Sequence, residues 1–140
     1  MQIIVSGHGH FASGLESTVK LLAGQLKQVS YIDFTQEMDE DALRQAFKKQ
    51  LDQDRQAVFF CDLFGGTPFK QAVLLSSDYA DTAVIAGGNI AALMEVALPG
   101  INTYANAQEL ADKLLAASQA GLKKFNRHHV RPQNETEEGI

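Results

Sequence analysis

The stretch AVFFCDLFGGTPF, residues 57–69, joins a nearly unbroken apolar run to a glycine pair and then to a proline. Such a run is typical of a strand covered on both faces, as in parallel sheets. Thr67 can cap a following helix that has Pro68 at its first position. The stretch therefore predicts a strand, a tight loop and a helix, in that order.

The same unit recurs along the chain. Apolar runs at 2–6, 29–34 and 82–88 predict three more strands, and a segment of helical period follows each of them. A helix is expected over 10–23, and later ones begin after the N-caps Asp39 and Asn89. Asn106 and Glu109 resemble a capping box for a last helix, which Gly121 should end. Two of the expected apolar faces are Phe11, Leu15, Val19 and Leu22 in the first helix, and Phe69, Ala72 and Val73 in the third.

Successive βα units predict an α/β fold, with an open, mainly parallel, doubly wound sheet and helices on both faces. If the strand order is 2-1-3-4, a crevice forms between the carboxyl ends of the first and third strands. The 140 residues and 45% hydrophobic content suit one domain, expected over 1–125. Residues 126–140 lack apolar periodicity, which predicts a disordered tail.

Composition excludes several classes of function. A net charge of −5 offers no basic surface for displacing counterions, so we expect no nucleic-acid partner. The single cysteine, Cys61, cannot form an internal disulfide and suits a reducing compartment. No targeting segment precedes the first strand and no apolar run is long enough to span a bilayer, which predicts a cytoplasmic protein.

The predicted crevice brings two polar stretches together. His8 follows the first strand, and Asp62 with the loop Gly65, Gly66 and Thr67 follows the third. A carboxylate that binds one ring nitrogen of a histidine leaves the other nitrogen free as a nucleophile. Free N–H groups at the start of a helix bind anions, and a phosphoryl group is the electrophile that such a site suits.

Other chemistries fit less well. His8 and His10 could begin a metal site, but their loop supplies no cysteine or acidic ligand, so we expect no metal. The nucleotide-binding patterns GxxxxGK[ST] and GxGxxG do not occur, and no cofactor is expected. Topology favours His8 over His10, because His8 lies nearer the strand end and Asp62.

Three motifs carry a family resemblance: SGHGHFASGL at 6–15, DLFGGTPFKQA at 62–72 and VIAGGNIAALMEVAL at 84–98. Over about residues 1–125 the chain resembles the IIA component of the mannose family (mannose, fructose and sorbose type) of the bacterial phosphoenolpyruvate-dependent sugar phosphotransferase system. The resemblance implies that His8 is the phosphorylated histidine and that Asp62 binds its other ring nitrogen, leaving Nε2 for the phosphoryl group. It also places Gly9, Gly65, Gly66 and Thr67 around that group.

The resemblance extends to two further regions. Family members usually continue the third motif with asparagine, an apolar residue, proline and methionine, whereas this chain has Asn89, Ile90, Ala91 and Ala92. The family forms homodimers that exchange a short antiparallel edge strand, and GLKKF at 121–125 is the matching place.

The function that the resemblance implies is that of a phosphotransferase with a phosphohistidine intermediate. The phosphocarrier HPr would donate to His8, and His8 would pass the group to a IIB component, with membrane IIC and IID components acting afterwards. The expected partner surface comprises His10, Phe11, Phe64, Phe69 and Asn89. Two alternatives are a phosphocarrier domain serving dihydroxyacetone kinase and a phosphorylation-dependent sensor module.

Overall fold

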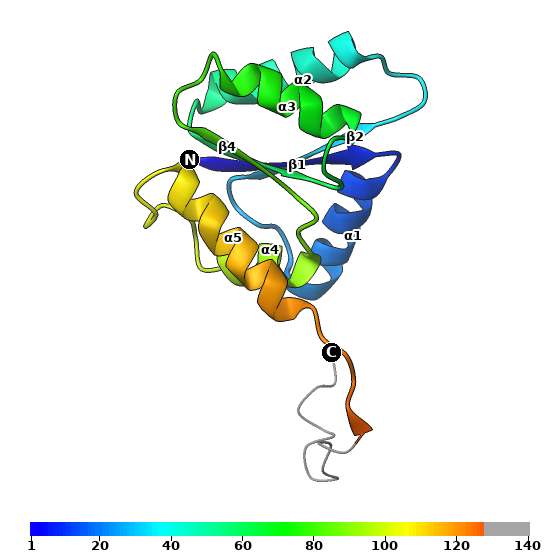
Figure 1. The fold of residues 1–140 in the computed structure, drawn as a ribbon, viewed down its shortest axis with the longest axis vertical. Coiled ribbons are helices and arrows are strands. Elements are labelled where there is room, and N and C mark those ends of the chain that lie inside the picture. The colour runs from blue at the N-terminus through cyan, green and yellow to red at the C-terminus, as the bar shows by residue number, and fades with distance from the viewer. Residues whose placement is uncertain (128–140) are drawn as a thin grey trace.

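The computed structural model describes residues 1–127, which form a parallel sheet between two layers of helices (Figure 1). The strands are β1 (Gln2–His8), β2 (Val29–Phe34), β3 (Ala57–Cys61) and β4 (Thr82–Ala86). The helices are α1 (Phe11–Ala23), α2 (Glu40–Gln53), α3 (Thr67–Ser76), α4 (Ile90–Ala97) and α5 (Ala107–Gly121). The strands pair in the order β2-β1-β3-β4, which confirms the predicted α/β topology.

The two faces of the sheet are covered by different helices. Alternate residues of β1 and β3, such as Ile3 and Phe60, pack with α1, α4 and α5 in one core. Their neighbours Ile4 and Phe59 pack with α2 and α3 in the other. Because side chains alternate across a strand, a sheet covered on both faces needs apolar residues at every position, as in AVFFC.

Most predicted helix starts are confirmed. Asp39 accepts from the Ala42 N–H at 2.8 Å and Asn89 accepts from the Ala92 N–H at 2.9 Å. Asn106 caps α5 through the Glu109 N–H. The capping box is altered, because the Glu109 carboxylate accepts from the Ala105 N–H, one residue before the cap.

Several details differ from the sequence expectations. The N-cap of α3 is Gly66, so Thr67 and Pro68 occupy its first turn. The fourth strand stops at Ala86, because Gly87 turns the chain with a φ of 81°. Leu22 and Val73, expected on core-facing stripes, are 45% and 43% exposed. Periodicity alone misplaced them, since each helix buries only a narrow stripe against the sheet.

The carboxyl-terminal predictions are tested only in part. Residues 122–126 adopt no strand in the single chain, so the exchanged edge strand stays a prediction that needs a second copy. The predicted tail lies almost wholly at 128–140, outside the described residues.

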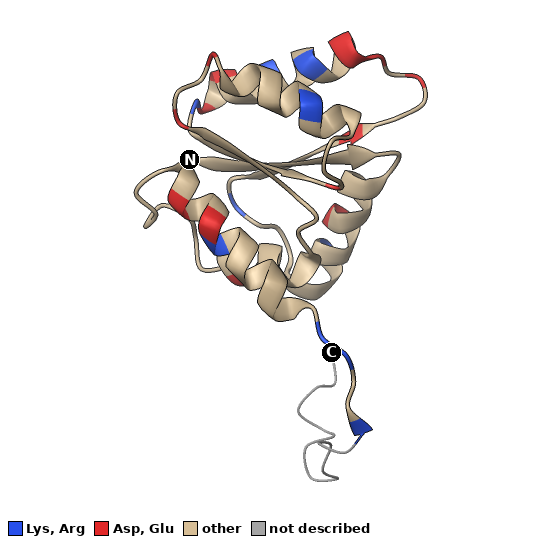
Figure 2. Ribbon diagram, in the orientation of Figure 1, with Lys and Arg blue, Asp and Glu red and all other residues tan. Residues whose placement is uncertain are grey.

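Charge is distributed as the layered fold requires. Figure 2 shows Lys and Arg interspersed with Asp and Glu along the helices, while the strands carry few charged residues. A sheet that is buried on both faces excludes unpaired charges, because desolvation of an ion costs far more than apolar burial returns. The charged strand-end residues, among them Asp33 and Asp62, therefore stand out as candidates for chemistry.

Candidate functional site

The carboxyl ends of β1 and β3 lie next to each other and carry the predicted histidine and aspartate. The parallel register pairs Ser6 with Cys61, and the Asp62 N–H continues it by donating to the Ser6 carbonyl at 3.2 Å. His8 is the last residue of β1, and Asp62 follows β3 directly. Strand pairing therefore brings together two residues that are 54 positions apart in the sequence.

Two hydrogen bonds join His8 to Asp62. The His8 backbone N–H donates to Asp62 Oδ2 at 2.9 Å, and His8 Nδ1 lies 2.7 Å from the same oxygen. An ionised carboxylate only accepts, so Nδ1 carries the proton and Nε2 keeps its lone pair. The His8 side chain is 44% exposed and the Asp62 side chain 12%, so the ring reaches solvent while its anchor is nearly buried.

The environment of Asp62 keeps it ionised. Burial would raise the pKa of this carboxyl, but hydrogen bonds from the His8 N–H, the His8 ring and the Leu63 N–H outweigh burial and hold the pKa below its usual value. The Leu63 N–H donates to Asp62 Oδ1 at 2.9 Å, so each carboxylate oxygen has a donor. Asp62 is therefore a fixed negative charge on the Nδ1 side of the imidazole.

The amino end of α3 lies against the same ring. A Cβ built on Gly66 would stand 2.6 Å from His8 Cε1, so only glycine allows this approach. Gly65 has a φ of 83°, a left-handed conformation that glycine adopts without strain. Within residues 1–127 no side chain caps α3, and Thr67 and Phe69 carry N–H groups that the first turn of a helix leaves without partners inside the helix. This helix end can therefore receive an anion held near His8.

The Gly9 N–H is not free for the phosphoryl-binding role that the family resemblance implies. Its N–H donates to the Phe34 carbonyl at 2.8 Å, which occupies the donor that a bound group would use. Its φ of 58° instead makes the sharp turn from β1 into α1. Gly9 shapes the loop, and we leave it out of the proposed set of donors.

His10 forms a second histidine–carboxylate pair. Its Nδ1 lies 3.2 Å from Asp33 Oδ2, and its side chain is 84% exposed. Asp33 also accepts from the Ser13 N–H at 2.9 Å and from the Ser13 hydroxyl at 2.6 Å. The two histidines are thus held by carboxylates from different strands, β3 for His8 and β2 for His10.

Sequence reasoning missed two residues beside the site. Asp33 is the next-to-last residue of β2, and Phe34, the last, forms a T-shaped ring pair with His8, with ring centroids 6.0 Å apart and planes at 72°. The polar residue near the end of VSYIDF was the available signal for Asp33, because the carboxyl ends of parallel strands converge on one side of the sheet. Nothing in the sequence singled out Phe34, because one aromatic residue at a strand end forms no hydrophobic pattern that could mark it.

The residues predicted as a partner surface do not form one uniform patch. Phe64 is 81% exposed and stacks on Phe69, with ring centroids 4.6 Å apart. Leu63, which is 51% exposed, adds apolar surface in the same loop. Phe11 packs against the core beside Gly7, and Asn89 both caps α4 and donates to the Ser118 carbonyl. The exposed apolar surface near His8 therefore comes mainly from residues 63–64.

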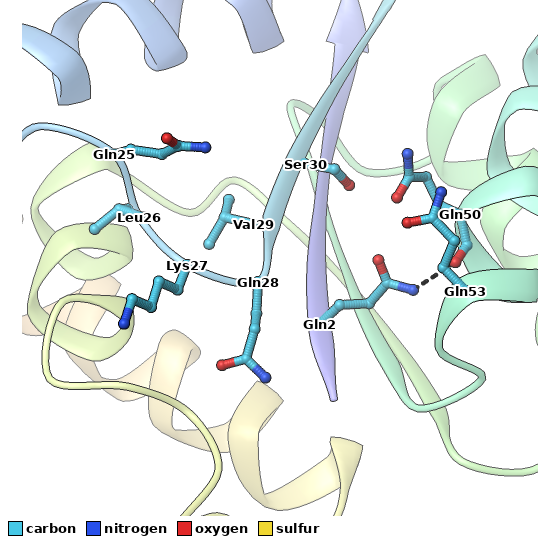
Figure 3. A pocket seen from close by; sticks show the side chains of 9 residues that line it. All are labelled: Gln2, Gln25, Leu26, Lys27, Gln28, Val29, Ser30, Gln50 and Gln53. Atoms are coloured by element: carbon cyan, nitrogen blue, oxygen red, sulfur yellow. Dashed lines mark hydrogen bonds between the residues drawn. The ribbon is translucent and has the colours of Figure 1, made fainter.

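A large cavity lies elsewhere, at the amino-terminal ends of β1 and β2 (Figure 3). Its volume is about 580 Å³, and its lining includes Gln2, Ser30, Gln50 and Gln53. Gln2 Nε2 donates there to the backbone carbonyls of Gln50 and Asp54. Neither His8 nor Asp62 lines this cavity. His8 and Asp62 lie at the opposite, carboxyl ends of the strands.

The described residues also bear on metal binding, membrane insertion and thiol chemistry. Among residues 1–127, no three His, Cys, Asp or Glu side chains gather as a group that could hold a metal ion. Over the same range, no helix combines the length and apolar character needed to cross a membrane. The thiol of Cys61 is buried, which with the nearby Asp62 charge raises its pKa to about 12 and makes it a poor nucleophile.

A parallel 2-1-3-4 sheet whose strand ends place a carboxylate-held, partly exposed histidine beside the amino end of a helix defines a class of α/β module. The family model described as "PTS system fructose IIA component" matches residues 2–115. The chain belongs to this family, the mannose-type IIA components of the sugar phosphotransferase system.

Curated relatives agree with this assignment. The fructose-specific EIIA component of Bacillus subtilis (strain 168) is 24% identical over 131 residues, which cover 91% of this chain and 88% of the relative. The mannose-specific EIIAB component of Escherichia coli (strain K12) is 33% identical over 96 residues, which cover 66% of this chain. This match spans only 30% of the length of the Escherichia coli protein.

Solved structures share the fold. A phosphotransferase system EIIA component from Streptococcus agalactiae superposes with a TM-score of 0.82 at 32% identity, covering 89% of this chain and 96% of that one. A mannose/sorbose-specific IIA subunit from Enterococcus faecalis gives a TM-score of 0.80 at 23% identity, covering 93% of this chain and 98% of that one. The layered sheet described above is thus the fold of these IIA components.

Substitution of Gly66 tests the packing of the helix end against His8. In Gly66→Ala the new methyl group must displace the imidazole, since its position lies 2.6 Å from His8 Cε1. We expect the His8 ring resonances in a ¹H–¹⁵N NMR spectrum to shift and the Nδ1 proton to exchange faster with water. Gly14→Ala is the matched control, because nothing lies within 4 Å of its Cβ position. Unchanged His8 signals in Gly66→Ala would contradict the contact.

The lowered pKa of Asp62 predicts a specific dependence of stability on pH. An aspartate in an unfolded chain titrates near about 3.9. Because the folded pKa is lower, the ionised carboxylate stabilises the fold above that value, and this contribution is lost as pH falls through the folded pKa. Urea unfolding of the wild type and Asp62→Asn should show a difference at pH 5 that shrinks as the pH falls below about 4. A difference that grows below about pH 4 would refute this assignment.

Proposed function

We propose that this chain is a phosphoryl carrier, with His8 Nε2 as the accepting atom. The observation that carries the proposal is the 2.7 Å bond between His8 Nδ1 and Asp62, which leaves Nε2 as the nucleophilic nitrogen on a partly exposed ring. The names of the relatives support it, since they are components of sugar phosphotransferase systems.

The phosphoryl transfer needs no metal ion or nucleotide, because each bond that forms is matched by one that breaks. The Nε2 lone pair forms a bond to phosphorus as the donor's phosphorus–nitrogen bond breaks, and that electron pair returns to the donor imidazole. The Nδ1 proton stays on His8, and the negative charge of Asp62 offsets the positive charge that the ring gains. The N–H groups of Thr67 and Phe69 at the start of α3 serve as donors to the phosphoryl oxygens, and Gly66 keeps that helix close to the ring.

The donor and the acceptor are those that membership of the family implies. A phosphohistidine on HPr donates to His8, and a IIB component accepts from it, while IIC and IID components use the group later in sugar uptake. Both bonds at the first step are phosphorus–nitrogen bonds, so that step runs nearly without change in free energy. Exposed Leu63 and Phe64, with Phe69 stacked against Phe64, form the apolar docking surface.

Labelling of two point variants tests the assignment of His8. The protein is incubated with phosphoenolpyruvate, enzyme I and HPr, and acid-labile phosphate is followed by intact mass. We expect one phosphoryl group on the wild type, none on His8→Ala and one on His10→Ala. His10 is the matched control, because it too is a histidine paired with a strand-end aspartate. Labelling lost in His10→Ala and kept in His8→Ala would overturn the assignment.

Substitution of Asp62 tests how the acceptor is held. Asp62→Asn keeps the side-chain volume but removes the charge that stabilises the phosphorylated ring, so phosphoryl transfer should slow by about tenfold or more. Rapid-quench measurement of His8 labelling gives the rate, and circular dichroism establishes that the variant is folded. Unchanged transfer kinetics would remove Asp62 from the mechanism.

A further inference from the structure

The connection between β1 and α1 consists of Gly9 and His10 alone, so its conformation decides where the His8 side chain points. Gly9 has a φ of 58°, and a glycine in this region rotates more freely than any other residue. Asp62 holds the Nδ1 end of the imidazole from β3. Asp62 also accepts the His8 backbone N–H, so it holds the ring and the residue that carries it, while the turn at Gly9 and His10 has to be constrained by other residues.

The neighbouring strand supplies that constraint. At the carboxyl end of β2, the Phe34 carbonyl accepts the Gly9 N–H at 2.8 Å, as an isolated antiparallel bridge. The Phe34 side chain presents its ring to the His8 imidazole at a centroid distance of 6.0 Å and an interplanar angle of 72°. Phe34 therefore contacts both the turn at Gly9 and the His8 ring next to that turn.

Asp33 holds the other side of the same turn. His10 is the N-cap of α1 but makes no side-chain cap, and Asp33 takes over by accepting the Ser13 N–H at 2.9 Å. The same carboxylate accepts from the Ser13 hydroxyl and the His10 ring. Burial would raise the pKa of Asp33, but hydrogen bonds from Ser13 and His10 outweigh it and keep the pKa low. The Asp33 carboxylate thereby links the start of α1 to the end of β2.

We propose that Asp33 and Phe34 are positioning residues for His8, which together fix the 8–10 turn so that Nε2 faces the open amino end of α3. The proposal rests on the phosphoryl-carrier function proposed above and deepens it. His8 is held from both neighbouring strands, by Asp62 of the β3 side and by Phe34 and Asp33 of the β2 side. Neither Asp33 nor Phe34 touches the phosphoryl group, so neither is a catalytic residue.

The arrangement also explains why the two helix ends at this edge are not equivalent. At α1, the Ser13 N–H is already bonded to Asp33, and the negative charge of that residue repels an approaching anion. At α3, no side chain caps the helix. Asp33 thus occupies the amino end of α1, and the amino end of α3 remains available to the anion next to His8.

Four variants test the proposal. Phe34→Leu removes the ring and keeps an apolar side chain, while Phe34→Tyr keeps the ring. Asp33→Asn still accepts the Ser13 N–H but loses the charge, and Asp78→Asn is the control, because Asp78 is an exposed aspartate between α3 and β4, away from the carboxyl edge. Thermal unfolding establishes that each variant is folded.

The first measurement is the rate of His8 labelling by phospho-HPr. We expect the labelling rate constant at saturating phospho-HPr to fall about tenfold in Phe34→Leu and in Asp33→Asn, with the half-saturating concentration of phospho-HPr within about twofold of the wild type, because positioning acts on the bound state. Phe34→Tyr and Asp78→Asn should keep the wild-type rate constant. A wild-type rate constant in both Phe34→Leu and Asp33→Asn would overturn the proposal.

The second measurement is independent of phosphoryl transfer. In the unphosphorylated protein, the His8 Nδ1 proton that is bonded to Asp62 should give a slowly exchanging NMR signal, which broadens in Phe34→Leu and Asp33→Asn and stays sharp in Phe34→Tyr. If the wild type accepts no phosphoryl group, the proposed function fails while this signal still tests the positioning. If the wild type is labelled and the signal is identical in all four variants, the positioning role fails alone.

Discussion

The hydrogen bond between His8 Nδ1 and Asp62 Oδ2 crosses from one parallel strand to the next, and the rest of the site is arranged around it. It requires β1 and β3 to be neighbours, although β2 and its flanking helices separate them in the sequence. A register slip of one residue would turn the His8 side chain to the other face of the sheet. Pairing of Ser6 with Cys61 is therefore a condition of the chemistry as well as of the fold.

Much of the architecture follows from the sequence because the signals are local and repeated. Apolar runs such as AVFFC have no alternation, which only a sheet covered on both faces accommodates. Asp39, Asn89 and Asn106 mark helix starts through hydrogen bonds to residues three positions on. The predicted burial of Leu22 and Val73 was wrong. The width of the buried stripe on a helix depends on how the helix packs on the sheet, and the helical period does not determine it.

The residues of the site also fall into two groups, those that the sequence predicts and those that it does not. His8, Asp62 and the 65–67 loop follow strands directly, so strand order brings them together. The roles of Asp33 and Phe34 depend on how β2 meets the turn after β1, a tertiary contact that leaves no mark in either segment. The assignment of the α3 cap to Thr67 was wrong, because the helix begins at Thr67 and its N-cap is Gly66. Gly66 also lies against the His8 ring, a tertiary contact that the sequence does not show.

Aspartates also occupy the opposite edge of the sheet, but they hold only the scaffold there. Asp81 accepts from the Ala107 N–H at 2.8 Å and from the Gln56 side-chain amide, so it ties the start of α5 to the turn before β3. An all-parallel sheet sends every strand start to this edge and every strand end to the other. Stability and the candidate site thus depend on the same residue type in two separate places. Mutations at the amino ends of the strands can change how long the protein survives heat or proteases while His8 keeps its surroundings, which gives the two properties room to evolve independently.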